Sequence, residues 1–324
     1  MPNINKSLNL IIFPTEECNF RCKYCYEHFE IGRMYENVIN GIKSLIKERS
    51  KDIDRLNLDW FGGEPLLAFD IVDDIMKYAR KCADVSGLTL TSGMTTNASL
   101  FTKTKQEELI RLGVTKFQIT LDGDTELHNS LRVTRNNTST FNIIYNNLID
   151  FHRSSLDGKI IIRLHVNRYN LSSMKSLINK ISQDFKDDER ISLLIRELER
   201  LGGSNDEKLP VIDDEIMRNR LIKELQEEAL DFGLKLYNPH NELPVCYAAT
   251  FGSYAIRATG EVSKCTVALY DQRNIIGHLS EDGKLNIDKE KLTYWVRGQF
   301  THNNMELLCP YRSEKNNLLS KEMS

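Results

Sequence analysis

The chain has 324 residues and a net charge of −3, so it is long enough for a large α/β domain with a smaller module and has no basic excess that favours nucleic acid. No apolar stretch is long enough to span a bilayer, and no signal peptide is recognisable at the N-terminus. Seven cysteines, three of them crowded near the start, fit metal binding in a reducing cytoplasm better than disulfides. We therefore expect a cytoplasmic protein without a nucleic-acid or membrane partner.

Short apolar or β-branched runs alternate with helical patterns over the first two-thirds of the chain. Six runs predict strands, at residues 8–14, 56–61, 88–94, 116–121, 159–166 and 191–195. Apolar residues spaced three and four apart predict helices between them, at 36–48, 71–83, 104–112, 141–151 and 173–185. This alternation predicts parallel strands joined by right-handed crossovers. We expect an α/β fold over residues 1–200, a partial (β/α)6 barrel, because six units are too few to close an eight-unit barrel.

The pattern changes in residues 201–324, where we expect a small α+β module. A glycine-rich run at 202–206 predicts a flexible break, and an amphipathic pattern predicts a helix at 213–232. A hairpin is expected at 253–264 and a further helix at 292–300.

Three cysteines stand close together in the run Cys18-Asn-Phe-Arg-Cys22-Lys-Tyr-Cys25, just after the first predicted strand. Three such thiolates can hold three irons of a cubane [4Fe–4S] cluster and leave the fourth iron open. The alternatives are a small zinc site or a chance cluster, but zinc usually needs a fourth ligand at a matching spacing. In barrels of this kind chemistry gathers at the C-terminal ends of strands, where this run lies.

The spacing, with Tyr24 directly before the last cysteine, resembles the radical S-adenosylmethionine (radical SAM) superfamily. The resemblance implies that Cys18, Cys22 and Cys25 are the catalytic ligands of a cluster whose open iron binds SAM. It further implies that an electron from the cluster cleaves SAM to methionine and a 5′-deoxyadenosyl radical, which takes a hydrogen atom from the substrate. It also implies a partial (β/α)6 barrel and an oxygen-poor context.

The run Gly62-Gly63-Glu64-Pro65 ends the second predicted strand. Two glycines allow a backbone carbonyl to approach a ligand, and a strand-end glutamate can accept from an ammonium group. The run resembles the Gly-Gly-Glu motif that holds the SAM amino group in the family. A plain strand–helix turn is the alternative.

Polar residues also end the later strands. We expect the cofactor-binding residues to include Tyr24, Asn97, Asp122, Arg132, Arg163, His165 and Asn167, because polar groups at strand ends can bind the ribose or carboxylate of SAM, and Arg163 and His165 can reach SAM or substrate. Asp and Asn at strand ends are also ordinary turn formers and caps. Arg163 and His165 share one strand face, which looks either into the barrel or outward. Arg196, Glu197 and Glu199 follow the sixth strand and either meet a polar substrate or form a solvated charge run.

A second cysteine set, Cys246, Cys265 and Cys309, resembles the SPASM and twitch extensions that hold auxiliary [4Fe–4S] clusters in this superfamily. Arg312 occupies the place where the twitch pattern has its last cysteine. We expect one auxiliary cluster with three cysteine ligands, and the alternative is three buried cysteines acting as small apolar residues. Candidates for the fourth ligand are the substrate, His240, His278, His302 and Cys82.

These resemblances imply a radical SAM enzyme with a peptide or protein substrate and an electron donor such as flavodoxin or ferredoxin. The first interpretation is a maturase of a ribosomally synthesised peptide, forming a crosslink or thioether or epimerising a residue. The alternatives are an anaerobic sulfatase-type formylglycine maturase and a radical dehydrogenase of a small molecule. A non-catalytic iron–sulfur scaffold is disfavoured by Glu64 and the other strand-end groups.

Overall fold

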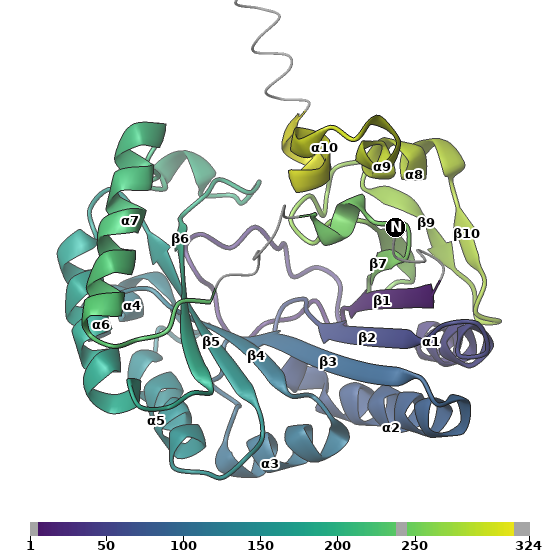
Figure 1. Ribbon diagram of the computed structural model, residues 1–324, viewed down its shortest axis with the longest axis horizontal. Helices are drawn as coiled ribbons and strands as arrows, with labels where there is room; N and C mark the ends of the chain where they lie inside the picture. Colours follow the sequence, from purple (N-terminus) through teal and green to yellow (C-terminus); the bar gives the residue numbers. More distant parts are fainter. Residues whose placement is uncertain (1–5, 238–244, 314–324) are drawn as a thin grey trace, which may run out of the picture.

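The computed structural model describes residues 6–237 and 245–313. One curved sheet runs through the molecule in the order β10-β9-β8-β7-β1-β2-β3-β4-β5-β6, and its ends, β10 and β6, do not pair with each other. Helices cover the convex face of this sheet (Figure 1). The predicted partial barrel is confirmed, because β1 to β6 are parallel and successive in the sheet.

The predicted elements match the observed ones to within a few residues. The strands are β1 (Ser7–Ile12), β2 (Arg55–Trp60), β3 (Thr89–Thr96), β4 (Lys116–Leu121), β5 (Lys159–Val166), β6 (Ile191–Glu197), β7 (Ser253–Ile256), β8 (Glu261–Ser263), β9 (Ile275–Leu279) and β10 (Leu285–Ile287). The helices are α1 (Glu36–Arg49), α2 (Phe69–Ser86), α3 (Lys103–Leu112), α4 (Thr125–Leu131), α5 (Phe141–His152), α6 (Leu171–Phe185), α7 (Glu215–Asp231), α8 (Lys289–Val296), α9 (Gly298–Thr301) and α10 (Asn304–Leu308).

Alternation along the strands divides the sheet into two faces. In β5, Ile160, Ile162 and Leu164 are fully buried in the main core, whereas Arg163 and His165 line a cavity on the other face. The outward face therefore supplies the hydrophobic core beneath the helices. The inward face supplies polar groups to the inside of the barrel.

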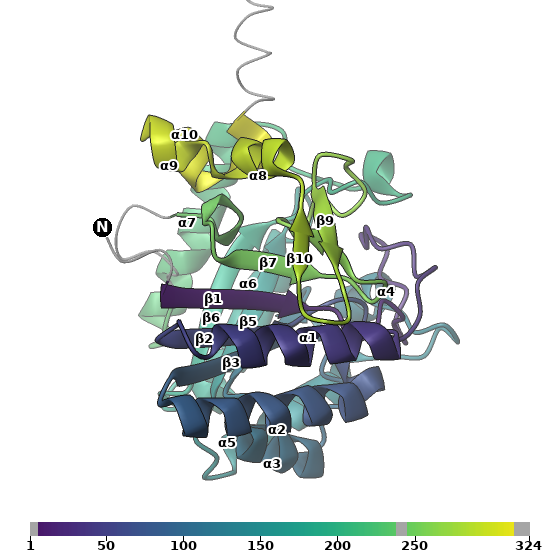
Figure 2. The ribbon, with the colours of Figure 1, turned by 90° about the vertical axis from the view of Figure 1, so that its right-hand side faces the viewer.

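The C-terminal module continues the sheet of the barrel. β7 pairs in parallel with β1, from Asn9 opposite Ser253 to Ile12 opposite Ile256, and β8, β9 and β10 follow as an antiparallel meander. Figure 2 shows β7 lying along β1, with α8 and α9 on the side of β7 away from β1. The sequence predicts the hairpin but not its union with β1, since pairing between distant segments leaves no local signal. The division at residue 200 stays a prediction about folding units.

Three further segments differ from expectation. α4 was not predicted, although Asp124 caps it by accepting from the backbone N–H of Leu127 at 3.0 Å. The helix expected at 292–300 is two short helices, α8 and α9. The predicted flexible break at 202–206 packs on the cysteine loop, as described below. No helix in the described part of the chain is long and apolar enough to cross a membrane.

Candidate active site

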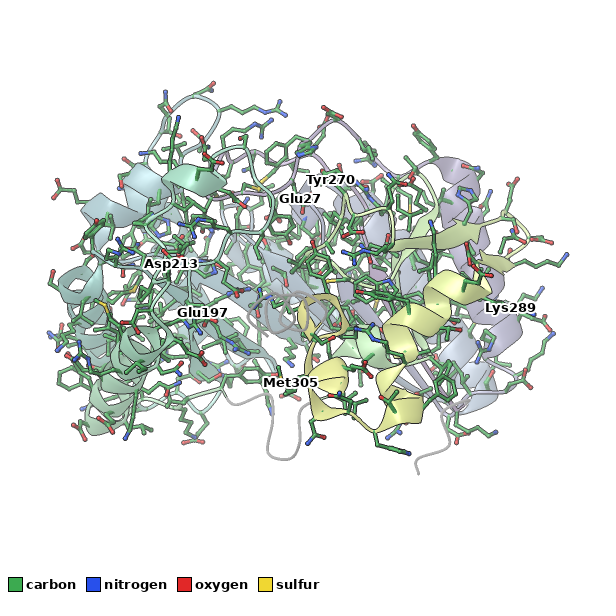
Figure 3. All side chains as sticks on the ribbon, turned by 90° about the horizontal axis from the view of Figure 1, so that it is seen from above. Glu27, Glu197, Asp213, Tyr270, Lys289 and Met305 are labelled. Atoms are coloured by element: carbon green, nitrogen blue, oxygen red, sulfur yellow. The ribbon has the colours of Figure 1, made fainter. Side chains whose placement is uncertain are left out.

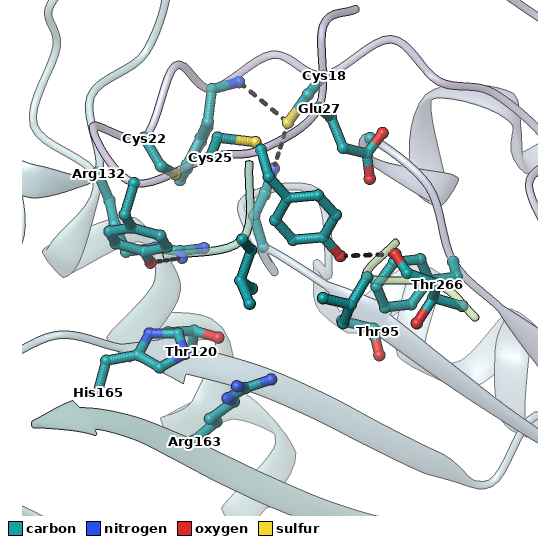
Figure 4. Close-up of a pocket in the computed structure, with 18 of the residues that line it drawn as sticks. Cys18, Cys22, Cys25, Glu27, Thr95, Thr120, Arg132, Arg163, His165 and Thr266 are labelled. Carbon is teal, nitrogen blue, oxygen red and sulfur yellow. Dashed lines mark hydrogen bonds between the residues drawn. The ribbon is translucent and has the colours of Figure 1, made fainter. Parts of the chain in front are cut away.

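The three N-terminal cysteines lie in the loop after β1, at the C-terminal end of the parallel strands. Cys18 is buried, Cys22 and Cys25 are partly buried, and all three line one cavity of about 350 Å³. Figure 4 shows them along one side of this cavity, with Arg163 and His165 on the side opposite. The structure thus places the predicted cluster ligands where barrel enzymes carry their chemistry.

The surroundings of these cysteines suit iron–sulfur ligation. The Cys18 sulfur accepts from the backbone N–H of Phe20 at 3.3 Å and from Nδ2 of Asn97 at 3.7 Å. Burial raises the pKa of the Cys18 and Cys25 thiols to about 12, with nearby negative charges adding to the effect. Buried thiolates therefore need a bound cation, which the irons of a [4Fe–4S] cluster provide.

Gly62 and Gly63 hold the end of β2 against the cysteine loop. A Cβ on Gly62 would lie 2.4 Å from the Thr15 carbonyl oxygen, and one on Gly63 would lie 2.2 Å from that of Glu17. Gly62 also has a φ of +104°, which side chains rarely adopt. Both glycines line the cavity, so the backbone at this point is accessible to a ligand.

Glu64 and Pro65 lie behind the cavity lining. Glu64 is fully buried, and its carboxylate accepts from Leu66 N–H at 3.0 Å, from the Thr96 hydroxyl at 2.7 Å and from Asn97 N–H at 2.7 Å. This glutamate therefore joins the ends of β2 and β3. Its predicted contact with the SAM ammonium stays a prediction, beside an evident structural role.

Asp122 is the centre of a buried polar network at the end of β4. Its carboxylate accepts from the Tyr24 hydroxyl and lies 2.9 Å from Nδ1 of His165 and 3.7 Å from Nη1 of Arg132. Arg132 also donates to the Tyr24 hydroxyl at 2.5 Å. The network brings together four of the predicted cofactor-binding residues from four segments of the chain.

The inward orientation of Arg163 and His165, left open by the sequence, is the one observed. Asn97 and Arg132 also line the cavity. Asn167 does not: it is buried, and its Oδ1 accepts from Tyr169 N–H at 2.9 Å in a turn after β5. Its cofactor role stays a prediction.

Sequence reasoning missed several residues of the cavity. Gln118 and Thr120 alternate with the buried residues of β4, which is a signal that could have identified them. Glu27 had no such signal, because it follows the cysteine motif in an irregular loop. Thr266 and Val267 reach the cavity only because the C-terminal module joins the sheet.

The segment after β6 forms another wall of the cavity. Glu197, Leu198, Glu199 and Leu201 line it. Seen from above, Glu27 and Glu197 lie toward the middle of the molecule and Lys289 toward its edge (Figure 3).

The predicted break at 202–206 is a packed part of this wall. A Cβ on Gly203 would lie 2.5 Å from the Cys25 carbonyl oxygen, and Asn205 donates to the Lys23 carbonyl at 3.2 Å. The glycine run is thus a close contact with the cysteine loop.

The second cysteine set also comes together. Burial raises the pKa of Cys246 to about 11, and the charges of Cys265 and Cys309 add to this effect, so the three thiols are neighbours. Cys246 N–H donates to the Leu307 carbonyl at 2.8 Å, and Val267 N–H donates to the Cys265 sulfur at 3.4 Å. Of these sulfurs, that of Cys265 accepts from a backbone N–H, and no group of three cysteine, histidine or acidic side chains in the described part of the chain is arranged to hold a single metal ion.

Arg312, which stands where the twitch pattern has a cysteine, turns to the barrel. Its Nη1 lies 2.5 Å from a carboxylate oxygen of Glu199, so it joins the C-terminal module to the segment after β6. Of the candidate fourth ligands, His240 lies outside the described residues. Cys82 is on α2, on the outer face of the sheet.

These features are typical of an enzyme whose chemistry takes place at the strand ends of an open barrel. A family model described as "Radical SAM superfamily" matches residues 12–181, more than half of the chain. The chain belongs to this superfamily, and it is a radical SAM enzyme; membership implies a [4Fe–4S] cluster and SAM.

Two curated relatives act on peptides or proteins according to their names. The chain is 26% identical to the cysteine-type anaerobic sulfatase-maturating enzyme of Clostridium novyi over 174 residues, which is 50% of this chain and 45% of that protein. It is 26% identical to the PqqA peptide cyclase of Gluconobacter oxydans over 119 residues, 37% of this chain and 31% of that protein. The chain thus spans less than half the length of each.

Solved structures share the fold. The structure of native anSMEcpe with bound AdoMet and Kp18Cys peptide has a TM-score of 0.68 at 18% identity and covers 93% of this chain and 84% of its own. Streptococcus suis SuiB bound to the precursor peptide SuiA has a TM-score of 0.61 at 17% identity, covering 86% and 63%. At these identities the likeness concerns the fold alone.

Proposed function

We propose that this enzyme binds SAM in the cavity and uses the radical chemistry of its family to modify a peptide. The carrying observation is that one cavity is lined by Cys18, Cys22 and Cys25 and also by Thr266 and Val267 of the C-terminal module. A substrate entering this cavity meets the cluster loop and the second module together. The bound cluster would supply the electron that cleaves SAM.

The chain's own groups suit the binding of SAM. Gly62 and Gly63 present backbone without side chains, and Asn97 has its amide beside Cys18. Arg132 carries a fixed positive charge near Tyr24 and suits the SAM carboxylate. Glu64, Pro65, Asp122 and Asn167 would support these groups from behind.

The relatives support two peptide reactions equally. One is maturation of a ribosomally made peptide by a crosslink, thioether or epimerisation, as the names of the PqqA cyclase and SuiB relatives suggest. The other is formylglycine formation, as in the sulfatase-maturating relative. Dehydrogenation of a small molecule is the remaining alternative, and no observation on the described residues specifically supports it.

We further propose an auxiliary [4Fe–4S] cluster on Cys246, Cys265 and Cys309. Arg312 cannot ligate iron, because its guanidinium stays protonated and offers no lone pair. The fourth iron would then be open or closed by a ligand other than cysteine. Anaerobic iron analysis should find about eight irons per chain, falling to about four in Cys265→Ala. Four irons in both proteins would exclude this cluster.

The function is tested with deuterated peptides. The protein is reconstituted with iron and sulfide without oxygen, reduced with dithionite and given SAM with carbon-deuterated peptides. One is the Cp18Cys peptide bound by anSMEcpe, and the others are short peptides encoded beside the gene. Deuterium in 5′-deoxyadenosine identifies the substrate, and mass spectrometry of the peptide identifies the reaction.

Two outcomes contradict the proposal. Formation of 5′-deoxyadenosine without deuterium from any peptide would favour a small-molecule substrate. Formation that is unchanged when Cys18, Cys22 and Cys25 are all replaced by alanine would remove the role assigned to these cysteines.

A further inference from the structure

A histidine–carboxylate pair lies on the cavity wall that faces the cysteine loop. Nδ1 of His165 is 2.9 Å from Oδ1 of Asp122, and the exposed fractions of the two side chains are 12% and 1%. Asp122 is itself fixed by the Tyr24 hydroxyl and by Arg132. The carboxylate therefore cannot turn away, and it holds the imidazole in one orientation.

The pair also fixes which ring nitrogen is free. Burial opposes ionisation of Asp122, but its contacts with His165 and Arg132 outweigh burial and hold the pKa of this carboxyl well below its usual range. An ionised carboxylate only accepts hydrogen bonds, so Nδ1 of His165 carries the hydrogen. The lone pair is left on Nε2, which has no hydrogen-bond partner among the described residues. His165 lines the cavity, with Arg163 two residues earlier on the same strand face (Figure 4).

We propose that His165 is the general base of the reaction, with Asp122 as its positioning residue. The inference rests on the proposed peptide modification and names a group that its oxidative reactions need. Oxidation of a peptide residue H–C–X–H, where X is sulfur, nitrogen or oxygen, breaks the C–H and X–H bonds and forms C=X. The hydrogen atom goes to the deoxyadenosyl radical, the X–H proton goes to Nε2 of His165, and one electron leaves to an iron–sulfur acceptor.

The charges around the imidazole support this role at neutral pH. Burial lowers the pKa of His165, and Arg163 lowers it further, against the opposing effect of Asp122. Arg132 adds to the lowering. From β6, Arg196 stands opposite His165 in the ladder. The Tyr24 ring packs edge-on against the imidazole, and Glu197 lines the same cavity. His165 is thus neutral and able to accept a proton.

The test separates hydrogen-atom transfer from proton transfer. In His165→Asn the amide nitrogen stands near the position of Nδ1 and can still donate to Asp122, whereas Nε2 is removed. Deuterium transfer from the carbon-deuterated peptide to 5′-deoxyadenosine is measured in each protein and is the reference against which the oxidised peptide is counted. Formation of the oxidised peptide should fall by about 100-fold or more.

His152→Asn is the matched control. His152 Nδ1 is also 2.9 Å from a carboxylate, that of Asp188, but it ends α5 outside the cavity. This variant should keep both deuterium transfer and product. SAM affinity and iron content are measured for all three proteins, because a merely structural effect would lower them along with product.

A second measurement needs no variant. In the wild type, the ratio of oxidised peptide to deuterated 5′-deoxyadenosine should fall as the pH drops through the lowered pKa of His165, because the base becomes protonated. Deuterium transfer alone should not follow this profile.

Several results overturn the inference. They are full product formation in His165→Asn, loss of SAM binding together with product, or a ratio that does not change with pH. A wild type that takes no deuterium from any peptide would instead remove the peptide function and this role with it. That outcome can be told apart from failure of the His165 role alone, because it is seen in the wild type before any variant is made.

Discussion

The Tyr26 hydroxyl donates to the backbone carbonyl of Thr266 at 3.0 Å. Tyr26 directly follows Cys25, and Thr266 directly follows Cys265, so one hydrogen bond joins the segments that carry the two cysteine sets. Thr266 N–H in turn donates to the Tyr247 hydroxyl at 2.9 Å, and Tyr247 directly follows Cys246. The two sets are therefore held in one connected piece of structure.

Replacing Tyr26 by Phe keeps the ring and removes this bond. We expect a loss of about 1 kcal/mol in the free energy of unfolding, measured by urea denaturation, with unchanged iron content. Tyr35→Phe is the control, since Tyr35 is exposed. A loss of iron in Tyr26→Phe would show that the contact does more than join the segments.

Arg257 and Glu16 form a buried ion pair between the module and the cysteine loop. Nε of Arg257 is 3.1 Å from Glu16 Oε1, and the exposed fractions of the two side chains are 4% and 2%. Arg257→Met leaves a buried carboxylate without its partner, which should cost about 3–5 kcal/mol in urea denaturation.

Two further variants check this expectation. Glu16→Leu combined with Arg257→Met should cost less than Arg257→Met alone, because no unpaired charge is left. Lys51→Met, which breaks an exposed pair with Glu48, should change the stability by less than about 1 kcal/mol. If the double variant were less stable than Arg257→Met, the loss of stability could not come from the unpaired carboxylate of Glu16.

Gly203→Ala should disturb the first cluster site. The added Cβ would lie 2.5 Å from the Cys25 carbonyl oxygen, so the cysteine loop or the segment after β6 must move. We expect fewer bound irons after reconstitution and slower formation of 5′-deoxyadenosine. Gly32→Ala is the control, because its nearest neighbour would be at 3.8 Å. Equal iron content in both variants would show that the cysteine loop can accommodate the added methyl group without losing iron binding.

The carboxylate of Asp188 gives a pH dependence of stability. Burial raises its pKa, but hydrogen bonds from Arg190 and His152 outweigh this and lower it to about 2, from 3.8. Its stabilising effect is therefore present above about pH 4 and is lost as the pH falls toward 2.

Asp188→Asn should thus destabilise the protein at about pH 6 and by about half as much at about pH 3, measured by urea denaturation of cluster-free protein. Asp54→Asn, at an exposed site, should change little at either pH. A constant difference between wild type and Asp188→Asn across this range would refute the assignment.

Lys23 is an exposed cation between Cys22 and Cys25 in the sequence. We expect an acidic electron donor such as flavodoxin to approach this face, where opposite charges speed association. Lys23→Glu should slow flavodoxin-driven formation of 5′-deoxyadenosine several-fold at low salt and leave the dithionite-driven rate unchanged. Lys289→Glu, at the edge of the molecule in Figure 3, should alter neither rate. If Lys23→Glu lowered the rate equally with flavodoxin and with dithionite, the effect would not come from docking of the electron donor.

Local signals predicted the barrel well. The period of the apolar residues identified its six strands and five of its helices, and the spacing of Cys18, Cys22 and Cys25 singled out three residues that line one cavity. These features depend on neighbours in sequence, which is why the sequence carries them. Alternation showed that Arg163 and His165 lie on the same face of their strand. It could not show whether that face looks into the barrel or outward, because the pattern does not say which face of a strand is buried.

Contacts between segments far apart in the chain could not be predicted from local sequence patterns. The ligand role of Glu64 stays a prediction, and its three hydrogen bonds could not be predicted because they depend on how β2 and β3 meet. Gly203 was interpreted as part of a flexible break because glycine has the same local preference in a loop and in a tight contact. The place of Thr266 in the cavity depends on β7 joining β1, a pairing between segments some 240 residues apart.

That pairing sets an order of events during synthesis. β1 and the loop after it leave the ribosome before β7, so one side of β1 stays open until Ser253–Ile256 has been made. Until then Ile11 and Phe13 lack Ala255 and Leu269, with which they pack in the folded protein. The pocket around the first three cysteines is therefore incomplete until β7 and the segment after it have been made. We expect iron to be loaded after translation rather than during it.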